Sequence, residues 1–303
     1  NLPSDTSGTT TFYATSTPTF GYLVFGGTGT TNLQTSITVA NRLGIAAGRT
    51  LNSEGATITL SGSNTNSSTF PLEVTGTFTA ATSTVTYSGT GATTVASTTY
   101  ATVNWNGATT YTLGGATTVS TAGTVASGTT LAVSTFTLTA TGSTWTNSGT
   151  VTEGTGGKIV KASASQFDNG SGTAKSAFSG DDRNTVYVRL TDTSLNLLAA
   201  TAETQTVTIT ANSMITDTET VTLTETTITS GIFSGGVTFG MSGTNVGSQL
   251  DYQGPGTLSF AYTDSQDSSD TGSGSGTFTG TAPGGGGGGG TTVVTTTTTT
   301  TAT

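Results

Sequence analysis

An internal repeat of 80 residues limits the architectures open to this chain. Thr19–Gly62 aligns without gaps on Thr99–Gly142, and the matches fall at apolar and glycine positions. Seven apolar pairs carry the alignment: Phe20 with Tyr100, Leu23 with Val103, Phe25 with Trp105, Leu33 with Leu113, Val39 with Val119, Ile45 with Val125, and Leu51 with Leu131. Repeated core and turn positions indicate one structural unit that is used twice.

Each copy consists of short alternating segments separated by glycine-containing turns. The chain holds 82 threonines and 44 glycines, and these residues favour strands and turns respectively. The sequence therefore predicts an all-β protein, with Leu195–Glu203 as the best short helical candidate. A β-solenoid with roughly 20 or more residues per coil fits this pattern. Two small antiparallel sandwiches of about 80 residues each are the alternative.

The first half of the chain also resembles a known group of surface proteins. The stretch STVTYSGTGATTVASTTYATVNWNG (Ser83–Gly107) is similar to repeats of long, haemagglutinin-like bacterial surface proteins, which are β-helical. Trp105 and Trp145 could stack on sugars, but an aromatic residue in an alternating segment is more typical of a core. Trp105 also occupies the position of Phe25 in the other copy, so we expect core residues.

The composition changes near Gly156-Gly157. Of the 16 acidic residues, only four precede Lys158, namely Asp5, Glu54, Glu73 and Glu153. Longer strand candidates follow: Thr185–Thr191, Thr204–Thr210, Thr218–Thr226 and Gly256–Thr263. We therefore expect a repeat domain over 1–157, an antiparallel β-sandwich over 158–282, and a glycine linker with a tail strand over 283–303.

The second domain resembles an Ig-like module of prokaryotic surface-layer and other cell-surface proteins. The segments DDRNTVYVRLTDTSLNLLAATAETQTVTIT, TDTETVTLTETTITSGIFSG and GTLSFAYTDSQDSSDT carry the resemblance over roughly residues 160–272. It implies a seven-strand-type sandwich that serves as a structural building block without catalytic activity. Family members often have an Asp-Pro-Asp turn after the VYVRLTD strand. Here the turn reads Asp192-Thr-Ser-Leu-Asn196, which weakens any metal role at that place.

The residues present do not favour an enzyme. The chain has no histidine and no cysteine, so nucleophilic triads with an imidazole base are excluded. A pair of carboxylates could serve acid–base catalysis, but Glu54 and Glu73 would come together only by coincidence of coil register. Arg42 and Arg49 are expected to be surface charges. We expect no enzymatic activity and no organic cofactor.

Calcium binding is the main site hypothesis. Asp264, Asp267 and Asp270 recur at every third position of TDSQDSSD, and Asp181-Asp182 forms another pair. Carboxylate oxygens in loops suit Ca²⁺, although the spacing is not that of an EF-hand. The alternative is a set of solvated acidic turns. Asn66 and Asn169 begin Asn-X-Ser sequons, which also arise by chance in a chain rich in serine and threonine.

Net charge and hydropathy limit the classes of partner that the chain can bind. The net charge of −9 argues against binding to nucleic acid, and no apolar run approaches the roughly 20 residues that cross a bilayer. The chain begins with Asn1 rather than Met, which suggests a removed signal or a chosen boundary. With few lysines and no cysteine, we expect an extracellular or cell-surface location.

The chain ends in a segment that needs a partner to become ordered. Seven glycines follow Pro283, and Thr291–Thr303 is rich in threonine but has only Val293 and Val294 to bury. We expect this tail to add a strand to the sheet of a neighbouring copy, giving a head-to-tail homopolymer. The assembly residues would be Thr291, Thr292, Val293, Val294 and Thr295. The alternatives are a monomeric adhesin with a low-complexity stalk and a carbohydrate-binding module for surface glycans.

Overall fold

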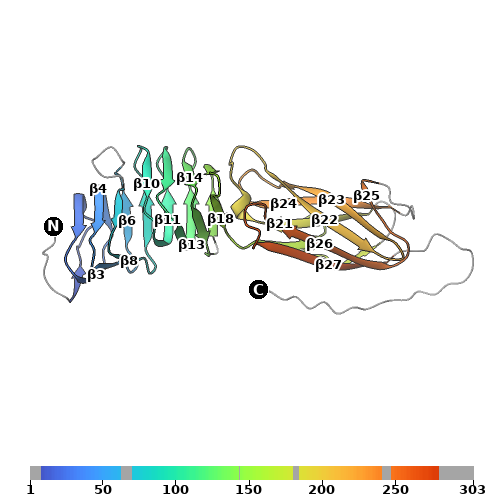
Figure 1. Ribbon diagram of the computed structural model, residues 1–303, viewed down its shortest axis with the longest axis horizontal. Coiled ribbons are helices and arrows are strands. Elements are labelled where there is room, and N and C mark those ends of the chain that lie inside the picture. Colours follow the sequence, from blue (N-terminus) through green and yellow to red (C-terminus); the bar gives the residue numbers. More distant parts are fainter. Residues whose placement is uncertain (1–7, 63–69, 143, 180–183, 241–246, 280–303) are drawn as a thin grey trace, which may run out of the picture.

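The computed structural model describes residues 8–62, 70–142, 144–179, 184–240 and 247–279. Regular structure in these residues is β-strand apart from one 3₁₀ turn, η1 (Thr193–Leu195). An N-terminal solenoid and a C-terminal sheet module lie end to end along the long axis of the molecule (Figure 1). The expected all-β class is confirmed.

The N-terminal unit is a β-solenoid of about seven turns. One ten-stranded sheet has the order β18-β15-β13-β11-β9-β6-β4-β2, with β7 and β16 attached, and two four-stranded sheets have the orders β1-β3-β5-β8 and β10-β12-β14-β17. The strands are β1 Thr9–Phe12, β2 Thr19–Phe25, β3 Gly29–Leu33, β4 Ile37–Ile45, β5 Arg49–Asn52, β6 Thr57–Leu60, β7 Leu72–Val74, β8 Thr77–Thr79, β9 Thr84–Tyr87, β10 Thr93–Val95, β11 Thr99–Trp105, β12 Thr110–Leu113, β13 Thr117–Val125, β14 Thr130–Ser134, β15 Thr137–Ala140, β16 Thr144–Asn147, β17 Thr150–Glu153 and β18 Lys158–Val160.

Parallel pairing between successive coils rules out the alternative of two sandwiches. Paired residues lie from 18 positions apart, as for Thr84 and Thr102, to 29 positions apart, as for Leu43 and Leu72. Parallel strands at this separation need a crossover connection, which each coil of a solenoid provides. Two small sandwiches, the alternative, would instead pair antiparallel strands through short turns.

The 80-residue repeat corresponds to a repeated arrangement of coils. β2 pairs with the nine-residue β4, and β11 pairs with the nine-residue β13. Both pairings shift register at equivalent places, between Phe20 and Tyr22 and between Tyr100 and Thr102. β4 then pairs with β6 and β7, as β13 pairs with β15 and β16. The matched apolar residues therefore hold equivalent places in the coils.

Apolar residues in register stack into a continuous core through the solenoid. One such row contains Phe20, Val39, Leu60, Tyr87, Trp105 and Val125. Trp105 and Trp145 are 0% and 5% exposed, and their rings pack edge to face with centroids 6.0 Å apart. The expectation that both tryptophans are core residues is confirmed, and neither is available to stack on a sugar.

Arg49 is buried, so its expected surface position is wrong. It is 6% exposed, and its guanidinium donates to the hydroxyl oxygens of Thr10 and Thr31 on neighbouring coils. Threonine acceptors on stacked strands supply the hydrogen bonds that a buried cation needs. Arg42 does lie at the surface, where it pairs with Glu73 at 2.6 Å and both side chains are about one-third exposed.

The C-terminal module is one nine-stranded sheet of order β19-β21-β24-β23-β22-β26-β27-β20, with β25 beside β24. Its pairings are antiparallel except β20 with β27 and β24 with β25. The strands are β19 Ala164–Asp168, β20 Ala177–Ser179, β21 Thr185–Thr191, β22 Thr204–Asn212, β23 Thr216–Glu225, β24 Ile232–Gly240, β25 Gln249–Asp251, β26 Gly256–Thr263 and β27 Thr271–Thr279. The expected strands Thr185–Thr191 and Gly256–Thr263 are confirmed.

This sheet folds over a single core of its own. Residues along β21, β23 and β26 alternate between buried and exposed, so each strand turns one face inward. Phe239 on β24 contacts Phe278 on β27 with ring centroids 5.2 Å apart, although three strands separate them in the sheet order. The inner faces of strands that are distant in the sheet therefore pack against each other.

The two units meet later in the chain than the composition suggested. β18 pairs in parallel with β15, so Lys158–Val160 belongs to the solenoid, and the C-terminal module begins with β19 at Ala164. The glycines near the expected boundary at residue 157 form a turn within the last coil, where the amide of Gly157 donates to the carbonyl of Gly154.

The helical candidate at Leu195–Glu203 is wrong. The backbone amides of Leu197 and Leu198 donate to the carboxylate of Glu203, and that of Leu197 also to the carbonyl of Leu195, two residues back, which is not the four-residue spacing of an α-helix.

Candidate functional site

The junction between the two units contains an ion pair and a cluster of three carboxylates. Backbone pairing holds it together: the amide of Val151 donates to the carbonyl of Leu197 at 2.7 Å, and the amide of Ala199 donates to the carbonyl of Gly149 at 3.0 Å. Leu197 also packs against the solenoid core. Segment 196–199 of the module therefore covers the last coil and excludes water from its end.

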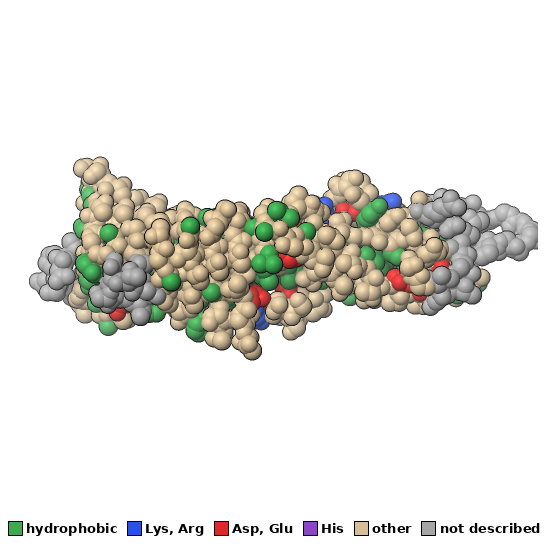
Figure 2. All heavy atoms as spheres, turned by 90° about the horizontal axis from the view of Figure 1, so that it is seen from above, with side chains coloured by type: hydrophobic (Ala, Val, Ile, Leu, Met, Phe, Trp, Pro, Cys, Tyr) green, Lys and Arg blue, Asp and Glu red, His purple; other side chains and the backbone are tan. Residues whose placement is uncertain are grey.

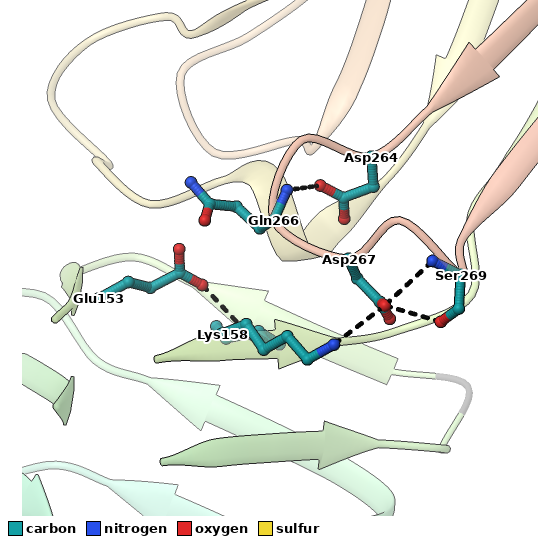
Figure 3. A network of polar contacts seen from close by, with 7 residues as sticks. Glu153, Lys158, Asp264, Gln266, Asp267 and Ser269 are labelled. Carbon is teal, nitrogen blue, oxygen red and sulfur yellow. Dashed lines mark hydrogen bonds and ion pairs between the residues drawn. The ribbon is translucent and has the colours of Figure 1, made fainter. Parts of the chain in front are cut away.

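An ion pair crosses the same junction. Lys158, on the last solenoid strand, reaches Asp267 in the turn between β26 and β27, with 3.1 Å from Nζ to Oδ1 (Figure 3). The Ser269 hydroxyl donates to the same carboxylate at 2.6 Å. The Ser269 hydroxyl and then Lys158 hold the pKa of Asp267 below its ordinary value. Asp267 is thus a charged anchor for the solenoid.

Beside this ion pair lies a cluster of three carboxylates, which we call the acidic cluster: Asp192, Asp264 and Asp270. Each offers one oxygen, and these oxygens all lie within 4.8 Å of one another. Asp192 and Asp264 are buried and Asp270 is half-buried. Asp192 precedes η1, whereas the other two belong to the β26–β27 turn.

Hydrogen bonds fix two members of the acidic cluster. Asp192 accepts from the amide and hydroxyl of Ser194 through Oδ1, and from the Tyr262 hydroxyl through Oδ2 at 2.8 Å. Asp270 accepts from the amide of Ser163 at 2.9 Å and from its hydroxyl at 2.9 Å. Ser163 lies between β18 and β19, so Asp270 holds the connection between the two units.

Asp264 is held from one side only. Its Oδ1 accepts from the backbone amide of Gln266 at 2.7 Å (Figure 3), and the backbone amide of Asp267 also stabilises its charge. Its Oδ2 is buried and accepts no hydrogen bond.

Burial opposes ionisation of two members of the acidic cluster, Asp192 and Asp264. Desolvation raises the pKa of Asp192 to about 6, against the hydrogen bonds from Ser194 and Tyr262, and the charges of Asp264 and Asp270 add to the increase. Desolvation also raises the pKa of Asp264. The neighbouring protein groups therefore do not compensate fully for these charges.

The three residues expected from the sequence as calcium ligands thus make two different kinds of contact. Asp264 and Asp270 lie together, but Asp267 turns to Lys158 and Asp192 takes its place. The departure from the Asp-Pro-Asp turn argued against Asp192, yet the position itself contributes a carboxylate. Asp181-Asp182 lies outside the described residues.

The other expected site residues are less informative. Asn169 is exposed in a tight turn, where its side-chain oxygen accepts from the amides of Ser171 and Thr173. Asn66 lies outside the described residues, as do the expected assembly residues 291–295.

Charged side chains are sparse over the solenoid on the face that Figure 2 shows. The face in Figure 2 is mostly backbone and uncharged polar side chains, with few Lys, Arg, Asp or Glu side chains over the solenoid half. Within the described residues, no helix has the length and hydropathy needed to cross a bilayer.

Comparisons with known proteins leave the function open. No protein-family model matches the chain, and no curated protein matches it. Among solved structures, one match is chitinase ChiW from Paenibacillus sp. strain FPU-7, described as bacterial cell-surface-expressed, multi-modular enzyme machinery. The identity is 12%, the TM-score is 0.22, and the alignment covers 89% of this chain but only 23% of that one. A similarity this low supports no argument about function.

Proposed function

We propose that this protein is a structural subunit of an extracellular filament in which copies join head to tail. The observation that carries the proposal is the outer edge of the first described coil, for which no described residue supplies a partner strand. Among the described residues, β1 pairs only with β3, and β2 only with β4. A solenoid end of this kind presents backbone donors and acceptors to which another chain can add.

Aromatic side chains accompany this open edge. Phe12 and Phe20 are half-buried and contact each other with ring centroids 6.0 Å apart. Tyr13 and Tyr22 are 69% and 56% exposed. Apolar area beside unpaired backbone is what a second copy would cover on stacking.

The tail would supply the connection. Residues Thr291–Thr295 would add as a strand to the next copy, and the glycine run would span the gap between copies. A contact between two different surfaces of the same chain does not close on itself, so repetition gives a filament.

Two further features support this role. The backbone pairing and ion pair at the junction tie the units into one rod, which suits a structural element. We also infer that the C-terminal module is an Ig-like sandwich of the surface-protein kind, in view of its antiparallel strands with alternating burial. The composition, poor in charged residues and free of cysteine, agrees with an extracellular location.

One observation favours a second function. Exposed tyrosines can stack on sugar rings, so Tyr13 and Tyr22 support a monomeric adhesin or carbohydrate-binding stalk for surface glycans. Binding of the monomer to a glycan array, lost in a Tyr13→Ala/Tyr22→Ala variant, would favour that alternative.

Blocking the open edge tests the filament. The carbonyl of Gly8 accepts from the amide of Thr30 in β3, and that of Phe12 from the amide of Gln34 directly after it. Alternation therefore points the N–H of Thr11 away from β3. Thr11→Pro removes this outward donor without removing a β1–β3 hydrogen bond. Sedimentation velocity should show polymers for the wild type and for Thr11→Val, but monomers for Thr11→Pro. Equal polymerisation of Thr11→Pro, or a wild type that stays monomeric at every concentration, would contradict the proposal.

A chain that ends at residue 290 tests the donor strand separately. If the tail is the donor, this variant should fold and remain monomeric. If the truncated chain polymerises and Thr11→Pro does not, the copies stack through their coils, and the tail is not the donor strand.

A further inference from the structure

The acidic cluster at the junction has the geometry of a cation site. Calcium binds oxygen ligands at about 2.3–2.6 Å, so two ligands of one ion lie at most about 5 Å apart. One oxygen each from Asp192, Asp264 and Asp270 meets this limit, since all three lie within 4.8 Å of one another. The three residues come from two separate turns, which a shared ion would connect.

A second observation is independent of this spacing. Asp264 is 2% exposed, and its Oδ2 is buried with no hydrogen-bond donor among the residues that the structure describes. Buried carboxylate oxygens are costly unless they are hydrogen-bonded or coordinate a cation. The other oxygen of Asp264 is fixed by the Gln266 amide, so the orientation of the carboxylate is already set.

Among the described residues, no Lys or Arg forms an ion pair with a member of the acidic cluster. The two ion pairs between described residues are Arg42 with Glu73 and Lys158 with Asp267. Neither includes a member of the acidic cluster. Three carboxylates in a mostly buried place repel one another, and a divalent cation would offset both the repulsion and the lost hydration.

The chemistry of the ligands selects the ion. The chain has no histidine or cysteine, so nitrogen and thiolate ligands for zinc or copper are absent. Carboxylate oxygens bind hard cations. Calcium accepts six to eight oxygens in irregular geometry, whereas magnesium demands a near-ideal octahedron and retains its waters.

We propose that Asp192, Asp264 and Asp270 bind a calcium ion that fixes the C-terminal module against the solenoid. The ion would hold the turn at η1 to the β26–β27 turn. The β26–β27 turn also contacts the solenoid side of the junction, because its Asp270 binds Ser163 and its Asp267 binds Lys158. This site does not depend on filament formation and can be tested on monomers such as Thr11→Pro.

The test uses the full-length chain after treatment with EDTA and dialysis. Isothermal titration with CaCl₂ should give one site per chain. Thermal unfolding at saturating Ca²⁺ should shift to higher temperature by about 5–10 °C, because a ligand that binds only the native state stabilises it. Asp264→Asn, which keeps the size of the side chain, should lose both the heat of binding and the shift.

Asp267→Asn is the matched control. It lies in the same turn but contacts Lys158 rather than the cluster, so it should retain the calcium-dependent shift despite a lower starting stability. Far-UV circular dichroism checks that both variants fold. No calcium binding by the wild type, or an equal shift in Asp264→Asn, would overturn the site. Equal binding of Mg²⁺ and Ca²⁺ would overturn the choice of calcium.

Discussion

Gly123 illustrates how single residues adapt the two copies of the repeat. It occupies the place of Leu43, 80 positions earlier, in strands of equal length. A Cβ atom at Gly123 would lie 2.5 Å from Cζ3 of Trp145, because the indole ring covers the backbone there. The large side chain of β16 therefore replaces the leucine of the first copy, and the volume of the core is conserved.

Gly123→Ala should consequently overpack this part of the core. We expect a loss of about 1–3 kcal/mol in the free energy of unfolding, measured by urea denaturation. Gly26→Ala serves as the control, since an added Cβ at Gly26 has no atom within 4 Å. It should cost no stability. Equal losses in the two variants would show that the Trp145 contact is not the cause.

At the scale of elements, Arg49 ties the first strand to the solenoid. Its hydrogen bonds to Thr10 and Thr31 join β1, β3 and β5. Arg49→Met keeps most of the apolar stem but removes these bonds, each of which is worth about 1.5–3 kcal/mol when one partner is charged. Amide hydrogens of β3 that bond to β1 should then exchange at least about tenfold faster.

Hydrogen exchange with mass spectrometry measures this effect, and peptides from β12 provide the internal control. Unchanged protection of β3 in Arg49→Met would contradict the account of Arg49. Equal acceleration in β12 would point to global destabilisation instead.

The predictable elements are those whose residues favour strands by themselves. β21 and β26 alternate apolar and polar residues and were predicted to the residue. β27 reads TGSGSGTFT and was not, because its contacts define it. A Cβ at Gly274 would lie 2.3 Å from a ring atom of Phe260, so the glycine admits an aromatic ring from β26. The repeat by itself favoured the parallel coils of a solenoid but did not exclude antiparallel pairing in two sandwiches.

The site was predictable in part for similar reasons. Acidic residues at every third position of a turn indicated ligands, but side chains in a turn point in different directions. Asp267 therefore faces Lys158, while Asp264 and Asp270 face inward. Asp192 is about 70 positions away in the sequence, and only the tertiary structure brings it to them.

At the scale of the whole molecule, the junction contains a second pair of carboxylates. The carboxylate of Glu203 accepts hydrogen bonds from the amides of Leu197 and Leu198, which belong to the segment that covers the solenoid. The carboxylate of Glu225 accepts one from the amide of Gly231. Burial and then a hydrogen bond with Glu225 raise the pKa of Glu203 to about 7. Among the described residues, the Glu225 carboxylate is the charged group that faces Glu203, and its proximity favours the protonated form of Glu203.

This pair predicts weaker docking at higher pH. The folded pKa of Glu203, about 7, lies above its ordinary value of 4.5. Its contribution to stability is therefore complete below about pH 4.5 and is lost as the pH rises through about 7. Between pH 5 and pH 8 the melting temperature should fall more for the wild type than for Glu203→Gln. Parallel pH profiles for the two proteins would contradict the raised pKa of Glu203.

Mass per length by scanning transmission electron microscopy tests the filament most directly. Purified full-length chain at increasing concentration should form unbranched filaments with one chain per rod length. Thr11→Pro should appear only as single rods under the same conditions. Single rods of the wild type at every concentration, or filaments of Thr11→Pro with the same mass per length, would contradict assembly through the open coil.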